Sequence, residues 1–203
     1  MSHRFVYFDL GNVLVNFDHQ IAVDQLSQLA ARPAELVRQV VFDSDLQNRY
    51  ETGLVSGHEF AAEINVELES AVPVAGILKA ISDIFQPNLP ILAAIEWVKQ
   101  SGIPMGILSN TCEAHWRWIE FQQWPMMGTW WSQIVLSYEV QSMKPDSKIY
   151  EVCEQRAGCS GHDVFFTDDR ADNIAAAEQR GWCTYQFESA KVLIERLEAW
   201  CGS

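Results

Sequence analysis

Hydrophobic and polar positions along the chain follow two alternating patterns. Short β-prone apolar runs such as Phe5–Phe8 are typical of strands that are buried on both faces of a parallel sheet. Longer stretches with an apolar residue every three or four positions are typical of helices. Strands are predicted at 5–8, 104–108, 133–137, 163–167 and 182–187, with helices at 91–101, 147–157, 173–180 and 190–200. This alternation predicts an α/β fold with a doubly wound, parallel, Rossmann-like sheet of about five strands.

The stretch 17–87 departs from this alternation because its pattern is helical throughout. Helices are predicted over 19–31, 33–42, 45–51 and 73–85, and Ser56 with Glu59 forms a capping box that begins another. We therefore expect an all-helical domain, 17–87, inserted in a Rossmann-like core of residues 1–16 and 88–203. The hinges are expected near Asn16 and Pro87.

The first strand ends in an aspartate, Asp9, which Gly11 follows two positions later. Ligands of open α/β sheets bind at the carboxyl ends of the strands. A carboxylate directly after a buried strand is costly unless it is solvated, paired or bound to a cation. Taken alone, Asp9 fits a functional site and a simple turn equally well.

Polar side chains also follow later strands. Ser109 and Asn110 come after the second strand, Lys144 lies in a loop, and Asp168 and Asp169 end the fourth strand. Asn173 follows four residues after this pair. Converging strand ends would bring together a nucleophilic carboxylate, a hydroxyl, a cation and a metal-binding pair.

The order and spacing of these segments resemble the haloacid dehalogenase-like superfamily, whose members are mostly phosphatases. The resemblance rests on Asp-Leu-Gly-Asn-Val from Asp9, Leu-Ser-Asn-Thr around Ser109, Met-Lys-Pro around Lys144 and Asp-Asp-Arg-x-x-Asn from Asp168. It implies a Mg²⁺-dependent phosphatase that forms an aspartyl-phosphate on Asp9. The substrate implied is a small phosphorylated metabolite, and the helical insert becomes a cap that covers the site.

The resemblance also implies a role for each motif residue. Asp9, the Gly11 carbonyl and Asp169 would hold Mg²⁺, with Asp168 also at the metal site and Asn173 in support. Ser109 and the N–H of Asn110 would hold phosphate oxygens, and Lys144 would neutralise phosphate and nucleophile together. Ser109 and Lys144 thus join Asp9 as catalytic candidates.

Position 11 departs from the family pattern. Family phosphatases usually carry a second aspartate there as general acid and base, and this chain has Gly11. Such a group typically contributes about 10²–10⁴-fold in rate, so we expect reduced efficiency unless the leaving group is good. Water or a cap residue would take the role. Separately, Arg49, Tyr50 and Glu51 of the cap are considered for the wall of the pocket, and the sequence does not orient them.

The form of the first motif resembles a bacterial subgroup that includes sugar-1-phosphate phosphatases of the glucose-1-phosphate type. The Met-Lys-Pro and Asp-Asp-Arg-x-x-Asn segments also resemble the phosphatase domain of soluble epoxide hydrolases. Two other functions stay open. In a haloacid dehalogenase Asp9 would attack carbon without a metal, whereas a degenerate member would only bind a ligand. The Asp168–Asp169 pair favours a metal, and the retention of all four motifs favours an enzyme.

Composition narrows the partners and the compartment. The formal net charge of −13 in 203 residues argues against a nucleic acid or an anionic membrane as partner. No apolar run approaches the roughly 18 residues of a membrane span, and no signal-peptide layout is seen. Five cysteines without a Cys-x-x-Cys pair favour a reducing cytoplasm. A monomer and a homodimer are both compatible with the sequence.

His58, His115 and His162 have no ligand-like spacing and are expected to be exposed or core residues.

Overall fold

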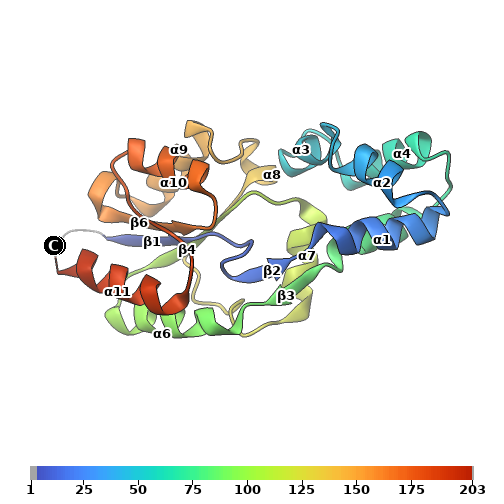
Figure 1. Ribbon diagram of the computed structural model, residues 1–203. Coiled ribbons are helices and arrows are strands. Elements are labelled where there is room, and N and C mark those ends of the chain that lie inside the picture. Colours follow the sequence, from blue (N-terminus) through green and yellow to red (C-terminus); the bar gives the residue numbers. More distant parts are fainter. Residues whose placement is uncertain (1–3, 203) are drawn as a thin grey trace.

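The central feature of the computed structural model, which describes residues 4–202, is a five-stranded parallel sheet. Its strands lie in the order β5–β4–β1–β6–β7 (Figure 1). Their bounds are β1 (Phe5–Phe8), β4 (Met105–Ser109), β5 (Gln133–Leu136), β6 (Val164–Asp168) and β7 (Cys183–Gln186). All four residues of β1 are buried, as expected for an apolar run in the middle of a sheet. The predicted fold class is confirmed.

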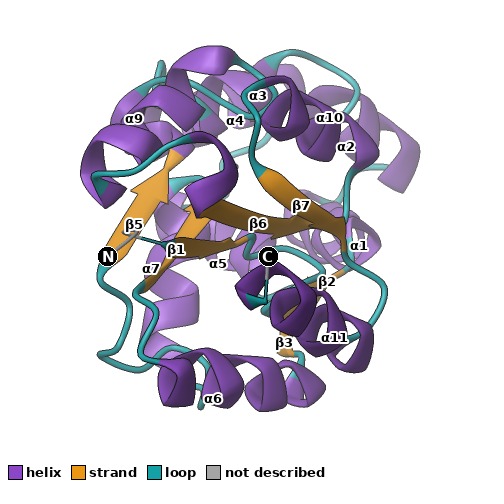
Figure 2. Ribbon diagram, turned by 90° about the vertical axis from the view of Figure 1, so that its left-hand side faces the viewer, coloured by secondary structure: helices purple, strands orange, loops and turns teal. Residues whose placement is uncertain are grey.

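Helices cover both faces of the sheet. The helices on one face are α9 (Ser147–Ala157) and α10 (Ala171–Gln179), and those on the other are α6 (Leu92–Ser101) and α11 (Ala190–Cys201). Figure 2 shows the sheet between these two layers. Each layer has its own buried cluster, with Tyr150 on one face and Leu197 on the other. The remaining short elements of this part are η1 (Leu89–Ile91), α8 (Ser137–Val140) and η2 (Gly161–Asp163).

A second group of helices lies beside the carboxyl end of the sheet (Figure 1). It consists of α1 (His19–Ala30), α2 (Ala34–Val41), α3 (Leu46–Glu51), α4 (Gly57–Glu67) and α5 (Val74–Ser82). These helices enclose a separate apolar cluster that includes Leu26, Phe60 and Ile77. The predicted capping box is present at the start of α4. Helix α7 (Glu113–Gln122) packs against α5.

A two-stranded antiparallel ribbon joins the two groups, and the sequence analysis did not predict it. It pairs β2 (Val15–Phe17) with β3 (Phe85–Pro87), so the helix predicted to run to Phe85 ends at Ser82. Three-residue strands are too short for an alternating pattern to be distinguished from a helical one. The ribbon places Phe17 opposite Phe85, with ring centroids 5.9 Å apart.

Strand order explains why distant motifs meet. From β1 the chain moves outward to β4 and β5, then returns to the other side of β1 for β6 and β7. The direction reverses between β1 and β6, and such a switch point is where open sheets form a crevice. Phe8 pairs with Thr167, and the Asp9 N–H donates to the Thr167 carbonyl at 2.9 Å. Asp9 therefore lies beside the acidic end of β6.

Candidate active site

A buried lysine joins the ends of three strands. Lys144, in the loop between α8 and α9, donates from Nζ to Asp9 Oδ1 at 2.7 Å and to Asp168 Oδ2 at 2.6 Å. A third bond, to the Leu108 carbonyl, is 3.0 Å long. The side chains of Lys144 and Asp168 are 1% and 0% exposed. Residues 135 positions apart in the chain are thus held together by one ammonium group.

Burial and charge oppose one another at these groups. Burial raises the pKa of Asp9, while Lys144 lowers it and Asp168 raises it again. Burial lowers the pKa of Lys144, but the charges of Asp9 and Asp168 and their hydrogen bonds more than offset this, so its pKa is raised. The ammonium form of Lys144 is therefore favoured.

Negative charge exceeds positive charge in this cluster. Carboxylate oxygens of Asp9, Asp168 and Asp169 all lie within 4.8 Å of one another. Lys144 contacts two of the three carboxylates. Arg170, which follows Asp169 directly in the chain, forms its ion pair with Asp172 instead. Three carboxylates with one lysine, all with oxygen donors, make a site suited to a hard divalent cation.

Asp168 is held from several sides. Its oxygens accept hydrogen bonds from Asn173 Nδ2 at 3.0 Å and from the Arg170 N–H at 2.8 Å, in addition to Lys144. The Asn173 carbonyl in turn accepts a bond from the buried hydroxyl of Tyr150 at 2.9 Å. Because both Asp168 oxygens are occupied, this residue is suited to orienting its neighbours. Asn173 lies where it supports Asp168.

Asp169 is held differently, by a residue that the sequence analysis did not single out. Asn12 donates from Nδ2 to Asp169 Oδ2 at 2.9 Å. Asn12 has a φ of 55°, a left-handed conformation that asparagine tolerates better than most residues. The position directly after Gly11 in a motif was the available signal. Asn12 thereby joins the loop after β1 to the loop after β6.

Ser109 and Asn110 lie at the end of β4, each in a different role. Asn110 Oδ1 accepts from the Lys144 N–H at 2.7 Å, and its Nδ2 donates to the Lys144 carbonyl at 2.8 Å. The Asn110 side chain therefore fixes the backbone of Lys144. Ser109 is buried, and its hydroxyl makes a bond of 3.3 Å to the Asn110 carbonyl.

A cavity of about 400 Å³ lies between the core and the helical group. Gly11 and the charged residues Asp9, Lys144 and Asp169 form one side of it. Its other side comes from the ribbon and the helices, through Phe17, His19, Asn48 and Glu51. A smaller adjoining hollow is lined by Ser109, Thr111 and His115, together with Gly11 and Glu51. The two groups of elements thus share one polar cavity.

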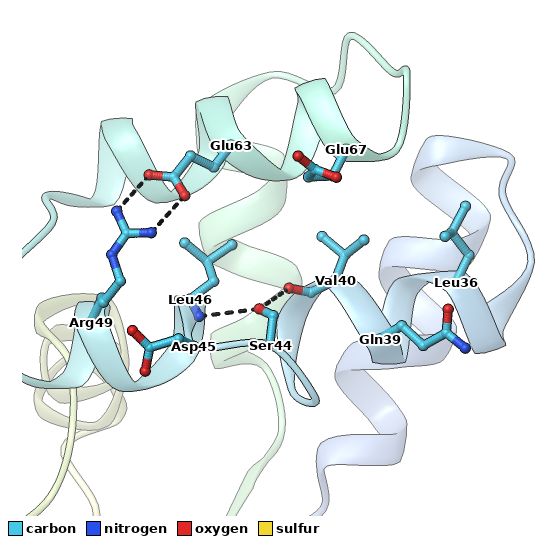
Figure 3. Close-up of a pocket in the computed structure, with 9 residues that line it drawn as sticks. All are labelled: Leu36, Gln39, Val40, Ser44, Asp45, Leu46, Arg49, Glu63 and Glu67. Atoms are coloured by element: carbon cyan, nitrogen blue, oxygen red, sulfur yellow. Dashed lines mark hydrogen bonds and ion pairs between the residues drawn. The ribbon is translucent and has the colours of Figure 1, made fainter.

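Helix α3 directs three consecutive residues to three different places. Arg49 donates to both oxygens of Glu63, at 2.9 and 2.8 Å, beside a separate hollow on the helical group (Figure 3). Tyr50 is buried and its ring stacks on Phe60 at 4.5 Å. Glu51 faces the cavity that contains Asp9. Of the three candidates, the structure brings only Glu51 to the site.

The remaining sequence expectations concern the histidines, the cysteines and membrane-spanning segments. His115 is buried, and His58 and His162 are exposed, as expected. Burial lowers the pKa of His115 to about 4, with His19 contributing in the same direction. All five cysteines are free, and burial raises the pKa of Cys112. Among residues 4–202, no helix is long and apolar enough to cross a membrane.

Comparison with known proteins identifies the class. Residues 3–181 match the haloacid dehalogenase-like hydrolase family, and the chain belongs to this family. A haloacid dehalogenase-like family enzyme from Bacteroides thetaiotaomicron, solved as a magnesium complex, superposes with a TM-score of 0.80. The two chains are 24% identical, and the match covers 93% of this chain and 95% of the other. A hydrolase from Porphyromonas gingivalis, predicted to belong to the same family, gives 0.81 at 18% identity over 100% of both chains.

Two curated proteins are also similar in sequence. Acyl-CoA dehydrogenase family member 10 of Mus musculus is 24% identical over 99% of this chain, but the match spans only 19% of that protein. An (S)-2-haloacid dehalogenase of Pseudomonas putida is 29% identical over 52% of this chain and 46% of its own length. This chain therefore matches less than half of either relative.

Proposed function

We propose that this protein is a Mg²⁺-dependent phosphatase that hydrolyses a small phosphorylated metabolite through an aspartyl-phosphate on Asp9. The excess of carboxylate over ammonium charge around Asp9 carries the proposal. A dehalogenase attacking a neutral carbon has no need of such an excess, whereas a divalent cation and a phosphate dianion together complement the cluster.

The donor set fits Mg²⁺. We assign Asp9, the Gly11 carbonyl and Asp169 as the residues that hold the ion, with Asp168 and Asn173 fixing the site around them. When bound, Mg²⁺ supplies positive charge that lets a carboxylate approach a phosphate. A related enzyme of the same fold has been solved with magnesium and inorganic phosphate, which supports this assignment.

Asp9 is arranged to act as a nucleophile. Its Oδ1 accepts from Lys144 at 2.7 Å and from the Leu10 N–H at 2.7 Å. Among the described residues, both hydrogen bonds to the Asp9 carboxylate end on Oδ1. Oδ2 is therefore left to form the bond to phosphorus. Lys144 would then neutralise charge shared by the carboxylate and the phosphoryl group. Ser109 and the Asn110 N–H are assigned to the phosphate oxygens.

The cavity indicates the size of the substrate. A volume of about 400 Å³ with charged and aromatic walls suits a small polar metabolite. A sugar phosphate fits best, because the first motif resembles sugar-1-phosphate phosphatases and an anomeric oxygen is a comparatively good leaving group. The proposal includes a cap of residues 17–87 and a core of residues 1–16 and 88–203. The free cysteines suit a reducing compartment such as the cytoplasm.

Haloacid dehalogenation is the second candidate. Gly11 favours it, since that reaction needs no proton donor at this position, and an (S)-2-haloacid dehalogenase is among the relatives. In this reaction Asp9 would displace a halide from carbon and water would hydrolyse the ester. The same protein can be tested for both activities, with phosphate and halide as the two products.

The test is phosphate release from a panel of sugar, acyl and aryl phosphates, with Mg²⁺ and with a chelator. We expect release that requires Mg²⁺ and that is lost in Asp9→Asn. Asp24→Asn, an exposed aspartate on α1, is the matched control and should retain activity. Halide release from a 2-haloacid that persists in chelator, without any phosphate release, would replace the phosphatase by the dehalogenase.

A further inference from the structure

Position 11 has no room for the side chain that family phosphatases use as an acid. A Cβ built on Gly11 would lie 2.8 Å from Cε1 of Phe17, which is below contact distance. The Phe17 ring is itself packed against His19 and Phe85, with centroids at 5.0 and 5.9 Å. Because Gly11 has no side chain that could donate a proton, a side-chain donor has to come from elsewhere around the cavity.

Glu51 is a cap residue that lines that cavity. It is the last residue of α3, and it lines both the main cavity and the adjoining hollow beside Gly11. Asp9, Lys144 and Asp169 line the same cavity. A cap carboxyl group is thus present in the wall of the same space as the groups assigned to the phosphate.

The backbone of Glu51 is anchored to the core. Ser137 Oγ donates to the Glu51 carbonyl at 2.6 Å and also accepts from the Thr111 N–H at 2.9 Å. Two residues later, Gly53 has a φ of 71°, and a Cβ there would lie 2.2 Å from the Tyr138 carbonyl oxygen. The helical group is therefore held against the core at this point, and the backbone position of Glu51 is fixed relative to the core.

The Glu51 carboxyl group is oriented by one hydrogen bond, to Oε1. Gln47 donates from Nε2 to Glu51 Oε1 at 2.6 Å, and the structure shows no ion pair for the carboxyl group among the described residues. Burial raises the pKa of Glu51, with Gln47 and the charge of Arg170 acting in the opposite direction. The other titratable groups around it are His19, His115 and Cys112, and Asp9, Lys144, Asp169 and Arg170 line the same cavity. The carboxyl group therefore keeps its proton to a higher pH than an exposed glutamate would.

We propose that Glu51 is the general acid and base of this enzyme, in place of an aspartate at position 11. The proposal rests on the phosphatase function proposed above. In the first step Asp9 Oδ2 bonds to phosphorus, the bond from phosphorus to the leaving oxygen breaks, and the leaving oxygen takes the proton of Glu51. In the second step water attacks phosphorus, Glu51 takes its proton, and the bond to Asp9 breaks. Asp9 and the protonated Glu51 are regenerated, with one alcohol and one phosphate released.

His19 is the other titratable cap residue on the cavity wall. Its ring stacks on Phe42 at 4.6 Å and also packs against Phe17, and burial lowers its pKa. As the first residue of α1, it also lies at the positive end of a helix dipole. Both effects disfavour imidazolium, so His19 is suited to contacting substrate as a neutral ring and not to donating a proton.

The experiment compares two leaving groups. For Glu51→Gln we expect kcat/KM to fall about 10²–10⁴-fold with a sugar or alkyl phosphate, whose leaving oxygen needs a proton. With p-nitrophenyl phosphate the loss should be less than about tenfold, because this leaving group departs as the anion. Glu63→Gln, which alters the ion pair with Arg49 outside the cavity, is the matched control. It should leave kcat/KM unchanged for both substrates. His19→Asn should lower kcat/KM to a similar extent for both substrates.

A pH profile and the unmodified enzyme complete the test. In the wild type, kcat/KM for the sugar phosphate should fall as pH rises through the raised pKa of Glu51, and Glu51→Gln should lose this alkaline limb. Equal losses for both leaving groups in Glu51→Gln, or no loss, would overturn the assignment. Should the variant fail to fold, the wild type still decides: a steep dependence of kcat/KM on leaving-group pKa would show that no acid acts. Absence of phosphate release from the wild type with every substrate would instead reject the phosphatase itself.

Discussion

The ring of Phe17 occupies the space next to Gly11 in which an acidic side chain would begin, with 2.8 Å between Cε1 and the position of a Cβ. Phe17 is fixed by the pairing of β2 with β3, which sets it opposite Phe85. The position of the Phe17 ring in the β2–β3 ribbon therefore depends on a glycine at position 11. Replacing one without the other changes the packing as well as the chemistry.

This relationship predicts that Gly11→Asp is destabilising. The ring must move within a packed aromatic group, so we expect the free energy of unfolding to fall by about 1–3 kcal/mol. Phe17→Leu should relieve the conflict, so that the double variant loses less than the sum of the two single changes. Urea unfolding of the four proteins measures this coupling. Strictly additive effects would show that the ring is free to move away.

Lys144 is predicted to be the most sensitive charge in the protein. Lys144→Met would leave Asp9 and Asp168 buried without their cation, so unfolding free energy should fall by about 3–5 kcal/mol. Adding Asp168→Asn should restore part of this stability, because it removes one of the two uncompensated charges. Arg117→Met, which breaks an exposed pair with Glu113, should change stability by less than about 1 kcal/mol. Similar losses for Lys144 and Arg117 would contradict the ion network.

Mg²⁺ is predicted to stabilise the folded protein. Binding to the acidic cluster adds about 1.4 kcal/mol when free Mg²⁺ is ten times its Kd, and the melting temperature rises accordingly. The measurement is thermal unfolding with Mg²⁺ and with chelator at equal ionic strength. Asp169→Asn should abolish most of the shift, whereas Asp172→Asn, outside the cluster, should preserve it. An unchanged shift in Asp169→Asn would place the ion elsewhere.

His115 is predicted to lower the free energy of unfolding as the pH falls below about 6.5. Its pKa is lowered to about 4 in the folded protein from an ordinary value of 6.5, so unfolding takes up a proton below the ordinary value. Its contribution is fully present above pH 6.5 and is lost as pH falls towards 4. Between pH 8 and pH 5 the loss amounts to about 2 kcal/mol.

Urea unfolding at a series of pH values tests this contribution. His115→Phe should show a weaker loss of stability below pH 6.5, because the group that takes up the proton is absent. His58→Gln, at an exposed position, should follow the wild type. A His115→Phe profile that parallels the wild type throughout would assign the acid sensitivity to other groups.

The sequence by itself determined the sheet, the five helices of the insert and the presence of acidic groups at strand ends. These features follow from local periodicity and from the rule that parallel strands share a carboxyl edge. The bridging of Asp9 and Asp168 by Lys144 needed the β1–β6 pairing that only the tertiary structure shows.

Only the tertiary structure decided which way individual side chains point. Arg49, Tyr50 and Glu51 are adjacent in sequence, and which of them faces the cavity depends on how α3 docks against Ser137 and Tyr138. Successive helical residues point about 100° apart, so a small rotation of the helix would exchange their roles. The contact of Asn12 with Asp169 and that of Phe17 with position 11 likewise depend on loops whose partners are remote in the chain. Local pattern carries no information about such contacts, because they are fixed by the packing of one group of elements on the other.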